Sequence, residues 1–165
     1  MLISARKKGF TLIEMLCVLA IISIIVGIHT LNLTTFTAEL KLRLATKELI
    51  NDLRFAKMYA VSNYSSTTKL QFYGEVAKNT FSCYKIYDPS KMAGSTIKDV
   101  KLKENIVIDG MHSTFSEGYV AKDIEFRFNG SVDPACTIAL KDTINNKLRY
   151  ITLTIGYTRA MEVDR

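Results

Sequence analysis

An uninterrupted apolar run near the N-terminus constrains the fold of this chain more than any other feature. Residues 10–28 contain one charged side chain, Glu14, and few other polar groups. As a helix with a rise of about 1.5 Å per residue, this run covers roughly 28 Å, which is close to the thickness of the hydrocarbon core of a bilayer. The run therefore predicts a long apolar helix that spans a membrane.

The basic residues before this run set its expected orientation. Arg6, Lys7 and Lys8 precede it, and no acid does. Under the positive-inside rule the N-terminus stays in the cytoplasm, and everything after about residue 30 lies outside. These three cations supply half of the formal net charge of +6. The remaining excess is small and is only a weak argument for a nucleic-acid partner.

Two simple interpretations of the run are a cleavable secretory signal and a plain membrane anchor. A secretory signal is disfavoured because no small-x-small cleavage site follows the run, which continues into an amphipathic helix. A plain anchor leaves Glu14 unexplained, since a carboxylate in a membrane helix costs on the order of 2.5–3.5 kcal/mol even on the lenient insertion scale. An ionisable group in such a helix should have a partner.

The start of the apolar run carries a recognisable motif. Residues 9–14 read Gly-Phe-Thr-Leu-Ile-Glu and follow directly after Lys7 and Lys8. This stretch resembles the class III signal of type IV prepilins and pseudopilins. The resemblance implies that a membrane-embedded prepilin peptidase cuts between Gly9 and Phe10 on the cytoplasmic side and methylates the new amine of Phe10. Residues 1–9 are then a leader that is removed.

The resemblance also explains Glu14. Cleavage after Gly9 leaves a cationic amine on Phe10, at the start of a helix whose dipole disfavours positive charge there. When such helices bundle, the Glu14 carboxylate of one chain can meet the Phe10 amine of its neighbour. The pair would also set the axial stagger of the subunits, a register role suited to buried polar groups. We therefore predict that Glu14 is an assembly contact with other pilin or pseudopilin subunits.

An amphipathic pattern extends the helix beyond the membrane run, so that one helix of roughly fifty residues is expected. An early stripe is expected to face lipid and other subunits: Leu33, Phe36, Leu40 and Leu44. A later stripe on a rotated face is expected to pack against a sheet: Leu49, Leu53, Ala56 and Ala60.

From Ser65 onward, short segments rich in β-branched and aromatic residues predict strands. They are residues 67–73, 81–87, 105–109, 124–128, 136–141 and 148–155, with one more after Gly156. Turn signals occur at Asn129-Gly130 and Asn145-Asn146, and residues 91–96 and 110–118 are expected to be loops.

These patterns predict an α+β fold, in which a long N-terminal helix packs on an antiparallel sheet, and the resemblance to prepilins implies that this fold is pilin-like. Residues 10–33 would form the hydrophobic stalk, in the membrane or in the filament core. Residues 34–165 would form one exported globular head that includes the amphipathic second half of the helix.

Three further stretches narrow the resemblance. They are LINDLRFAKMYAVSNYSSTTKLQF at residues 49–72, IEFRFNG at 124–130 and IGYTRAMEV at 155–163. They are similar to the H-type minor pseudopilins of type II secretion and to the T-type minor pilins. The resemblance implies a structural and assembly subunit of a type IV pilus, a competence pilus or a type II secretion pseudopilus. Such a subunit lies in the cytoplasmic membrane before it joins an extracellular or envelope-spanning filament.

DNA capture at a filament tip is a second hypothesis, because some T-type minor pilins are thought to bind DNA for uptake. The candidate phosphate contacts are Lys141, Lys147, Arg149, Arg159 and Arg165. Acidic residues are interspersed among them, which favours an ordinary solvated face.

Catalysis has little support in the sequence. His29 and His112 have no motif partner, and no H-E-x-x-H, G-x-S-x-G or phosphate-loop pattern occurs. Asp52 and Glu104 have basic neighbours and are interpreted as solvated helix and loop charges. We therefore expect no enzyme, metal or cofactor, and a signal-anchored envelope enzyme is the least favoured hypothesis.

The cysteines leave two alternatives open. Cys17 lies in the apolar run, where it behaves as a small hydrophobe. Cys83 and Cys136 lie on predicted strands of the exported part. A disulfide between them would stabilise the fold by about 4 kcal/mol in the chain-entropy model. Two buried thiols in a reducing setting are the alternative, because spacing alone does not establish contact.

Overall fold

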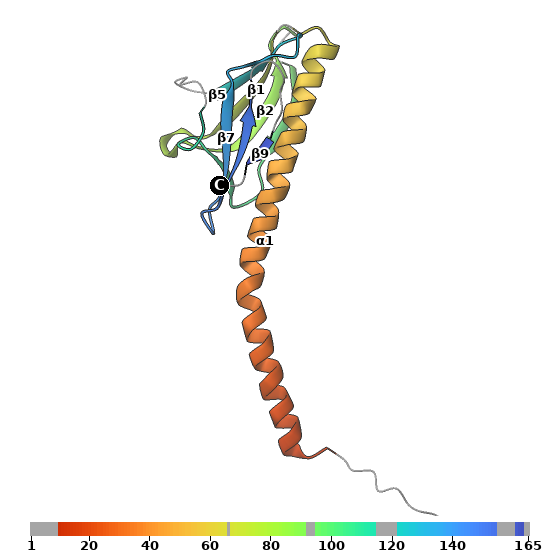
Figure 1. Ribbon diagram of the computed structural model, residues 1–165, viewed down its shortest axis with the longest axis vertical. Coiled ribbons are helices and arrows are strands. Elements are labelled where there is room, and N and C mark those ends of the chain that lie inside the picture. The colour runs from red at the N-terminus through yellow and green to blue at the C-terminus, as the bar shows by residue number, and fades with distance from the viewer. Residues whose placement is uncertain (1–9, 66, 92–94, 115–121, 155–160, 164–165) are drawn as a thin grey trace, which may run out of the picture. The chain divides into compact units, whose positions relative to one another are not determined.

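One long helix and one antiparallel sheet make up the computed structural model (Figure 1). It describes residues 10–65, 67–91, 95–114, 122–154 and 161–163, with the backbone alone at residues 28–33, 76, 122 and 161–163. The helix, α1 (Leu12–Ser62), has 51 residues, which confirms the single helix of roughly fifty residues. The chain divides into two compact units, Met1–Thr37 and Ala38–Arg165.

The first unit exposes its apolar side chains on every side of the helix. Phe10 is 83% exposed and Ile24 is 65% exposed, and the other large apolar side chains up to Val26 are similar. A helix that is apolar all round is stable in water only when something else covers it. The described residues of the chain do not cover these side chains. This part of α1 therefore needs lipid or another protein chain to bury them.

The second unit buries one stripe of α1. Leu49, Leu53, Ala56 and Ala60 are buried, as the later stripe predicts. Ala38, Leu42 and Ala45 extend the same stripe towards the N-terminus, so the buried face begins earlier than expected. Leu40 and Leu44 of the earlier stripe are exposed, and so is Phe36, which belongs to the first unit. The side chain of Leu33 lies outside the described residues.

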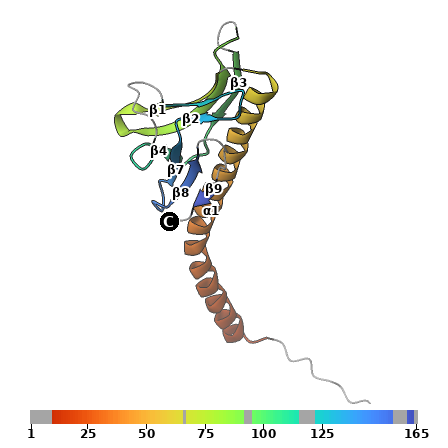
Figure 2. The same cartoon turned by 45° about the horizontal axis from the view of Figure 1, so that its top comes forward.

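The strands lie in one sheet whose neighbouring strands are all antiparallel. They are β1 (Thr68–Glu75), β2 (Thr80–Asp88), β3 (Ser95–Lys101), β4 (Ile106–Asp109), β5 (Lys122–Phe126), β6 (Val132–Asp133), β7 (Cys136–Asp142), β8 (Leu148–Leu153) and β9 (Met161–Val163). A short 3-10 helix, η1 (Val76–Lys78), joins β1 to β2. The order across the sheet is β6-β5-β1-β2-β4-β7-β8-β9, and β3 pairs with β2 outside this row. Figure 2 shows the part of the sheet that runs from β4 through β7 and β8 to β9.

The core lies between the buried stripe of α1 and one face of this sheet. Alternate residues of the strands point into it, as the pleat of a strand requires. Phe72 on β1 lies at its centre, with ring centroids 6.4 Å from those of Phe81 and Tyr84 on β2. The predicted α+β, pilin-like fold is therefore the observed one.

Two strands were not predicted. β3 begins at Ser95 and so replaces the end of the loop expected at residues 91–96. Five of its seven residues are polar, and its two apolar residues, Ile97 and Val100, are three positions apart, so no apolar alternation marks the strand in the sequence. Both apolar side chains are partly buried against the core, and pairing with β2 holds the strand in place. β6 has only two residues. The loop predicted at 110–118 is described only as far as Thr114, where no strand occurs.

Both predicted turns are present. Gly130 has a φ of 78°, and Asn146 has a φ of 55°, so each turn uses a residue that tolerates the left-handed region. A Cβ on Gly130 would also lie 3.3 Å from Cε of Lys57, so the β5–β6 turn passes close to α1.

Candidate functional site

The N-terminal motif forms a hydrogen-bonded start to α1. Thr11 immediately precedes the first helical residue, Leu12. The backbone N–H of Thr11 donates to Oε2 of Glu14 at 2.8 Å, and the Thr11 hydroxyl donates to the same oxygen at 2.9 Å. The backbone N–H of Glu14 donates in return to the Thr11 hydroxyl oxygen at 3.3 Å. This reciprocal pattern is a capping box.

The capping box gives Glu14 a second physical role besides the predicted contact with a neighbouring chain. The carboxylate satisfies donors at the helix start and lies at the positive end of the helix dipole. Thr11 was not singled out in the sequence, although the signal was present. Thr-x-x-Glu directly before an apolar run is a capping-box pattern.

Asp52 forms a polar cluster between α1 and the sheet. It is only 5% exposed. The Tyr84 hydroxyl donates to Oδ2 of Asp52 at 2.7 Å, and Nζ of Lys98 lies 2.5 Å from Oδ1. Burial and the adjacent Asp52 raise the pKa of Tyr84, which therefore stays a hydrogen-bond donor. The interpretation of Asp52 as a solvated helix charge was wrong, because its partners come from β2 and β3, far away in the sequence. Glu104 is exposed, as expected.

Of the candidate DNA contacts, the three that the structure describes, Lys141, Lys147 and Arg149, are each paired or partly or fully buried. Nζ of Lys147 lies 2.6 Å from Oε2 of Glu39, and this hydrogen bond lowers the pKa of Glu39. Arg149 is only 7% exposed. Both basic residues line a cavity of about 460 Å³ together with Glu39 and Tyr150. Lys141 is half-buried on β7. Arg159 and Arg165 lie outside the described residues.

Of the two alternatives that the sequence leaves open for Cys83 and Cys136, the structure has the free thiols, with Cys83 half-buried and Cys136 buried. Tyr84 faces the core, and its neighbour Cys83 on β2 therefore points to the opposite face of the sheet. Cys136 on β7 belongs to the core, and burial raises the pKa of its thiol to about 12. The two residues cannot bridge across the sheet.

His112 has a partner that the sequence did not indicate. Its Nδ1 lies 2.9 Å from Oδ2 of Asp109, a buried residue at the end of β4. The Ser113 hydroxyl donates to the carbonyl oxygen of Asp109 and accepts from the N–H of Ala139 at 2.9 Å. These contacts attach the segment after β4 to β7. The side chain of His29 lies outside the described residues.

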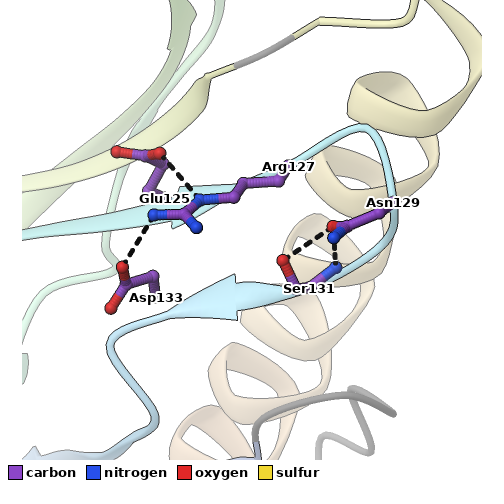
Figure 3. Close-up of polar contacts among 5 residues, drawn as sticks. All are labelled: Glu125, Arg127, Asn129, Ser131 and Asp133. Carbon is purple, nitrogen blue, oxygen red and sulfur yellow. Dashed lines mark hydrogen bonds and ion pairs between the residues drawn. The ribbon is translucent and has the colours of Figure 1, made fainter.

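The stretch IEFRFNG, residues 124–130, forms the end of β5 and the turn that leads to β6. Arg127 lies between two carboxylates, with Nε 3.3 Å from Glu125 and Nη2 2.9 Å from Asp133 (Figure 3). Oδ1 of Asn129 accepts from the N–H and the hydroxyl of Ser131, at 2.9 and 2.7 Å (Figure 3). These contacts join the two strands and the turn of the hairpin, and each carboxylate drawn is paired with the arginine.

The comparison with known families identifies the N-terminal segment. Residues 4–28 match the family model described as the prokaryotic N-terminal methylation motif. The match supports a type IV prepilin-like protein. No curated protein and no solved structure matches the chain significantly. The H-type and T-type subfamilies therefore stay predictions.

The match has consequences for partners and place in the cell. It implies processing by a prepilin peptidase, assembly with other pilins and attachment to a membrane, and it suggests a structural protein rather than an enzyme. In the part of the chain that the structure describes, no helix has the length and apolar character needed to cross a membrane. The single-pass orientation stays a prediction, and Arg6, Lys7, Lys8 and Gly9 lie outside the described residues.

Proposed function

We propose that this chain is a minor pilin or pseudopilin, a structural and assembly subunit of a type IV pilus, a competence pilus or a type II secretion pseudopilus. Residues 1–9 are the leader, cleavage falls between Gly9 and Phe10, and the Phe10 amine is methylated. Residues 10–33 anchor the subunit in the cytoplasmic membrane and later lie in the filament core. Residues 34–165 form the exported head.

The observation that carries this proposal is the methylation-motif match at residues 4–28, directly at the start of α1. Two further observations support it. The first unit exposes apolar side chains all around the helix, as a segment destined for lipid or for a helix bundle does. The second unit has a core of its own, as an exported head requires.

Processing is tested by mass spectrometry of the chain extracted from membranes of cells that contain the peptidase. We expect an N-terminus at Phe10 that carries a methyl group. Gly9→Val should leave the leader attached, because a residue without Cβ lets the backbone approach a catalytic pair closely. Gly27→Val is the matched control, since a Cβ at Gly27 meets nothing within 4 Å. An intact Met1 on the unsubstituted chain would contradict the proposal.

DNA capture stays a hypothesis from the sequence. Lys147 and Arg149 line one cavity, which is an observation in its favour. Against it, Lys147 pairs with Glu39 and Arg149 is buried, so neither presents a free cation to a phosphate backbone. We therefore place the structural role first.

A further inference from the structure

Four oxygen-bearing side chains with unused hydrogen-bonding capacity lie around Asp88, the last residue of β2. The side chains of Asp88, Thr68 and Ser65 are at least nine-tenths buried. Oδ2 of Asp88 and the hydroxyl oxygens of Ser65, Thr68 and Ser95 are buried, and none has a hydrogen-bond partner among the described residues. Buried polar atoms are nearly always paired, so four of them in one place point to a bound group.

The register of the sheet brings these side chains together. Ser95, the first residue of β3, is the cross-strand partner of Asp88. On the other side of β2, the pairing of Lys69 with Tyr87 places Thr68 next in register, opposite Asp88. Residues that lie opposite each other in antiparallel strands share a face, with Cβ atoms about 4.5–5.5 Å apart.

Ser65 brings the end of α1 into the cluster. Its N–H donates to the carbonyl oxygen of Ala60, in the last turns of the helix, at 3.0 Å. Burial acts to raise the pKa of Asp88, and the hydroxyls of Ser90 and Ser65 are among the groups that lower it. The Ser65 hydroxyl therefore lies near the carboxylate, although the two do not reach hydrogen-bond geometry. The C-terminal end of a helix carries partial negative charge, which favours a cation nearby.

The two oxygens of the Asp88 carboxylate are used differently. Oδ1 accepts from the N–H and the hydroxyl of Ser90, at 3.0 and 2.5 Å. Lys91 also acts on Asp88 electrostatically. Its Nζ, however, lies 2.5 Å from the Tyr59 hydroxyl and 5.1 Å from the centre of the Tyr59 ring. The lysine is therefore engaged with Tyr59, and Oδ2 is left for another positive charge.

We propose that Asp88, Ser65, Thr68 and Ser95 bind one small monovalent cation, such as Na⁺, which links the end of α1 to β1, β2 and β3. Carboxylate and hydroxyl oxygens are the ligands that hard cations prefer. The cluster contains one carboxylate, so one positive charge balances it. The described residues include no group of three or more Asp, Glu, His or Cys side chains that could hold a metal, which disfavours a divalent ion here. This inference is independent of the proposed function.

Thr68→Val is the sharpest variant, because it removes one proposed ligand and no hydrogen bond between described residues. If nothing is bound, the loss of an unpaired buried hydroxyl should leave the stability unchanged or raise it. If a cation is bound, the loss should remove the stabilisation that the cation provides. Thr46→Val is the matched control, since Thr46 is equally buried and its hydroxyl donates to the Leu42 carbonyl oxygen, at 2.8 Å, within α1.

The measurement is the melting temperature of the full-length chain in a non-ionic detergent, in NaCl and in choline chloride of the same ionic strength. Screening is equal in the two salts, and choline is too large to enter the cluster, so the difference reports cation binding. The unsubstituted chain should melt about 2–4 °C higher in NaCl, as expected for a ligand present at several times its Kd. Thr46→Val should keep this difference.

Thr68→Val and Asp88→Asn should lose the difference between the salts. The line width of the sodium NMR signal, measured on folded samples, should narrow in both variants and gives a readout that does not depend on unfolding. Equal melting temperatures of the unsubstituted chain in the two salts would overturn the inference and leave water as the bound group. A sodium effect that persists in Thr68→Val would also overturn it. Stabilisation by CaCl₂ without any by NaCl would overturn the assignment to a monovalent cation.

Discussion

The two units of this chain use apolar residues of one helix in opposite ways. In Met1–Thr37 the large apolar side chains of α1 that the structure describes are exposed on all sides. In Ala38–Arg165 a single stripe of α1 is buried against the sheet, and the opposite side carries the exposed residues. The second unit therefore buries its apolar stripe within its own chain. The first unit depends on lipid or on neighbouring helices to bury its apolar side chains.

The largest expected effect tests the buried stripe. Leu53→Asp should unfold a fragment that begins at residue 35, because it places an unpaired charge in the core at a cost of more than about 4 kcal/mol. Leu44→Asp is the matched control on the exposed side, and it should change the stability by less than about 1 kcal/mol. Thermal melting followed by circular dichroism measures both. Equal losses of stability would contradict the assignment of the two faces.

A smaller effect tests the polar cluster beneath α1. Tyr84→Phe removes the hydroxyl that donates to buried Asp52, and should destabilise the head by about 1.5–3 kcal/mol. Tyr73→Phe removes a similar bond, from Tyr73 to Asp99, at an exposed position and should cost less than about 0.5 kcal/mol. Urea unfolding of the same fragment gives the two values. If Tyr84→Phe left the free energy of unfolding unchanged, the hydrogen bond from Tyr84 to Asp52 would not contribute to the stability of the head.

The smallest effect concerns acid stability of the head. Burial acts to raise the pKa of Asp88 and of Asp109, but hydrogen bonds, from Ser90 and from His112 respectively, outweigh it and keep both below the ordinary value of 3.8. A carboxyl whose pKa falls on folding stabilises the folded state above its unfolded pKa, and this contribution is lost as the pH falls through the folded pKa. Stability should therefore decline as the pH drops below about 4.

Melting temperatures between about pH 7 and pH 2 check this expectation. Asp109→Asn should make the decline shallower, because one of the lowered pKa values is removed. Glu104→Gln, at an exposed loop position, should keep the full decline. If the melting temperature of Asp109→Asn fell with pH as steeply as that of the unsubstituted chain, the lowered pKa of Asp109 would contribute nothing to the acid dependence of stability.

Most elements of the fold could be predicted because their signals are local. The length of α1 and the stripe from Leu49 to Ala60 follow from apolar periodicity. Six of the strands follow from segments rich in β-branched and aromatic residues, and the turns at Gly130 and Asn146 follow from residue type. β3 could not be predicted in this way. Its mostly polar residues form a strand because they pair with β2 and because Ile97 and Val100 pack against the core.

The sequence by itself determined the prepilin-like N-terminus, the long helix and the α+β class, because a contiguous apolar run, a short motif and a repeating pattern are properties of neighbouring residues. Only the tertiary structure decided that Asp52 is buried with Tyr84 and that Cys83 and Cys136 point to opposite faces of the sheet. Those outcomes depend on the register between strands and on the rotation of α1 against the sheet. Both bring together residues that are far apart in the sequence.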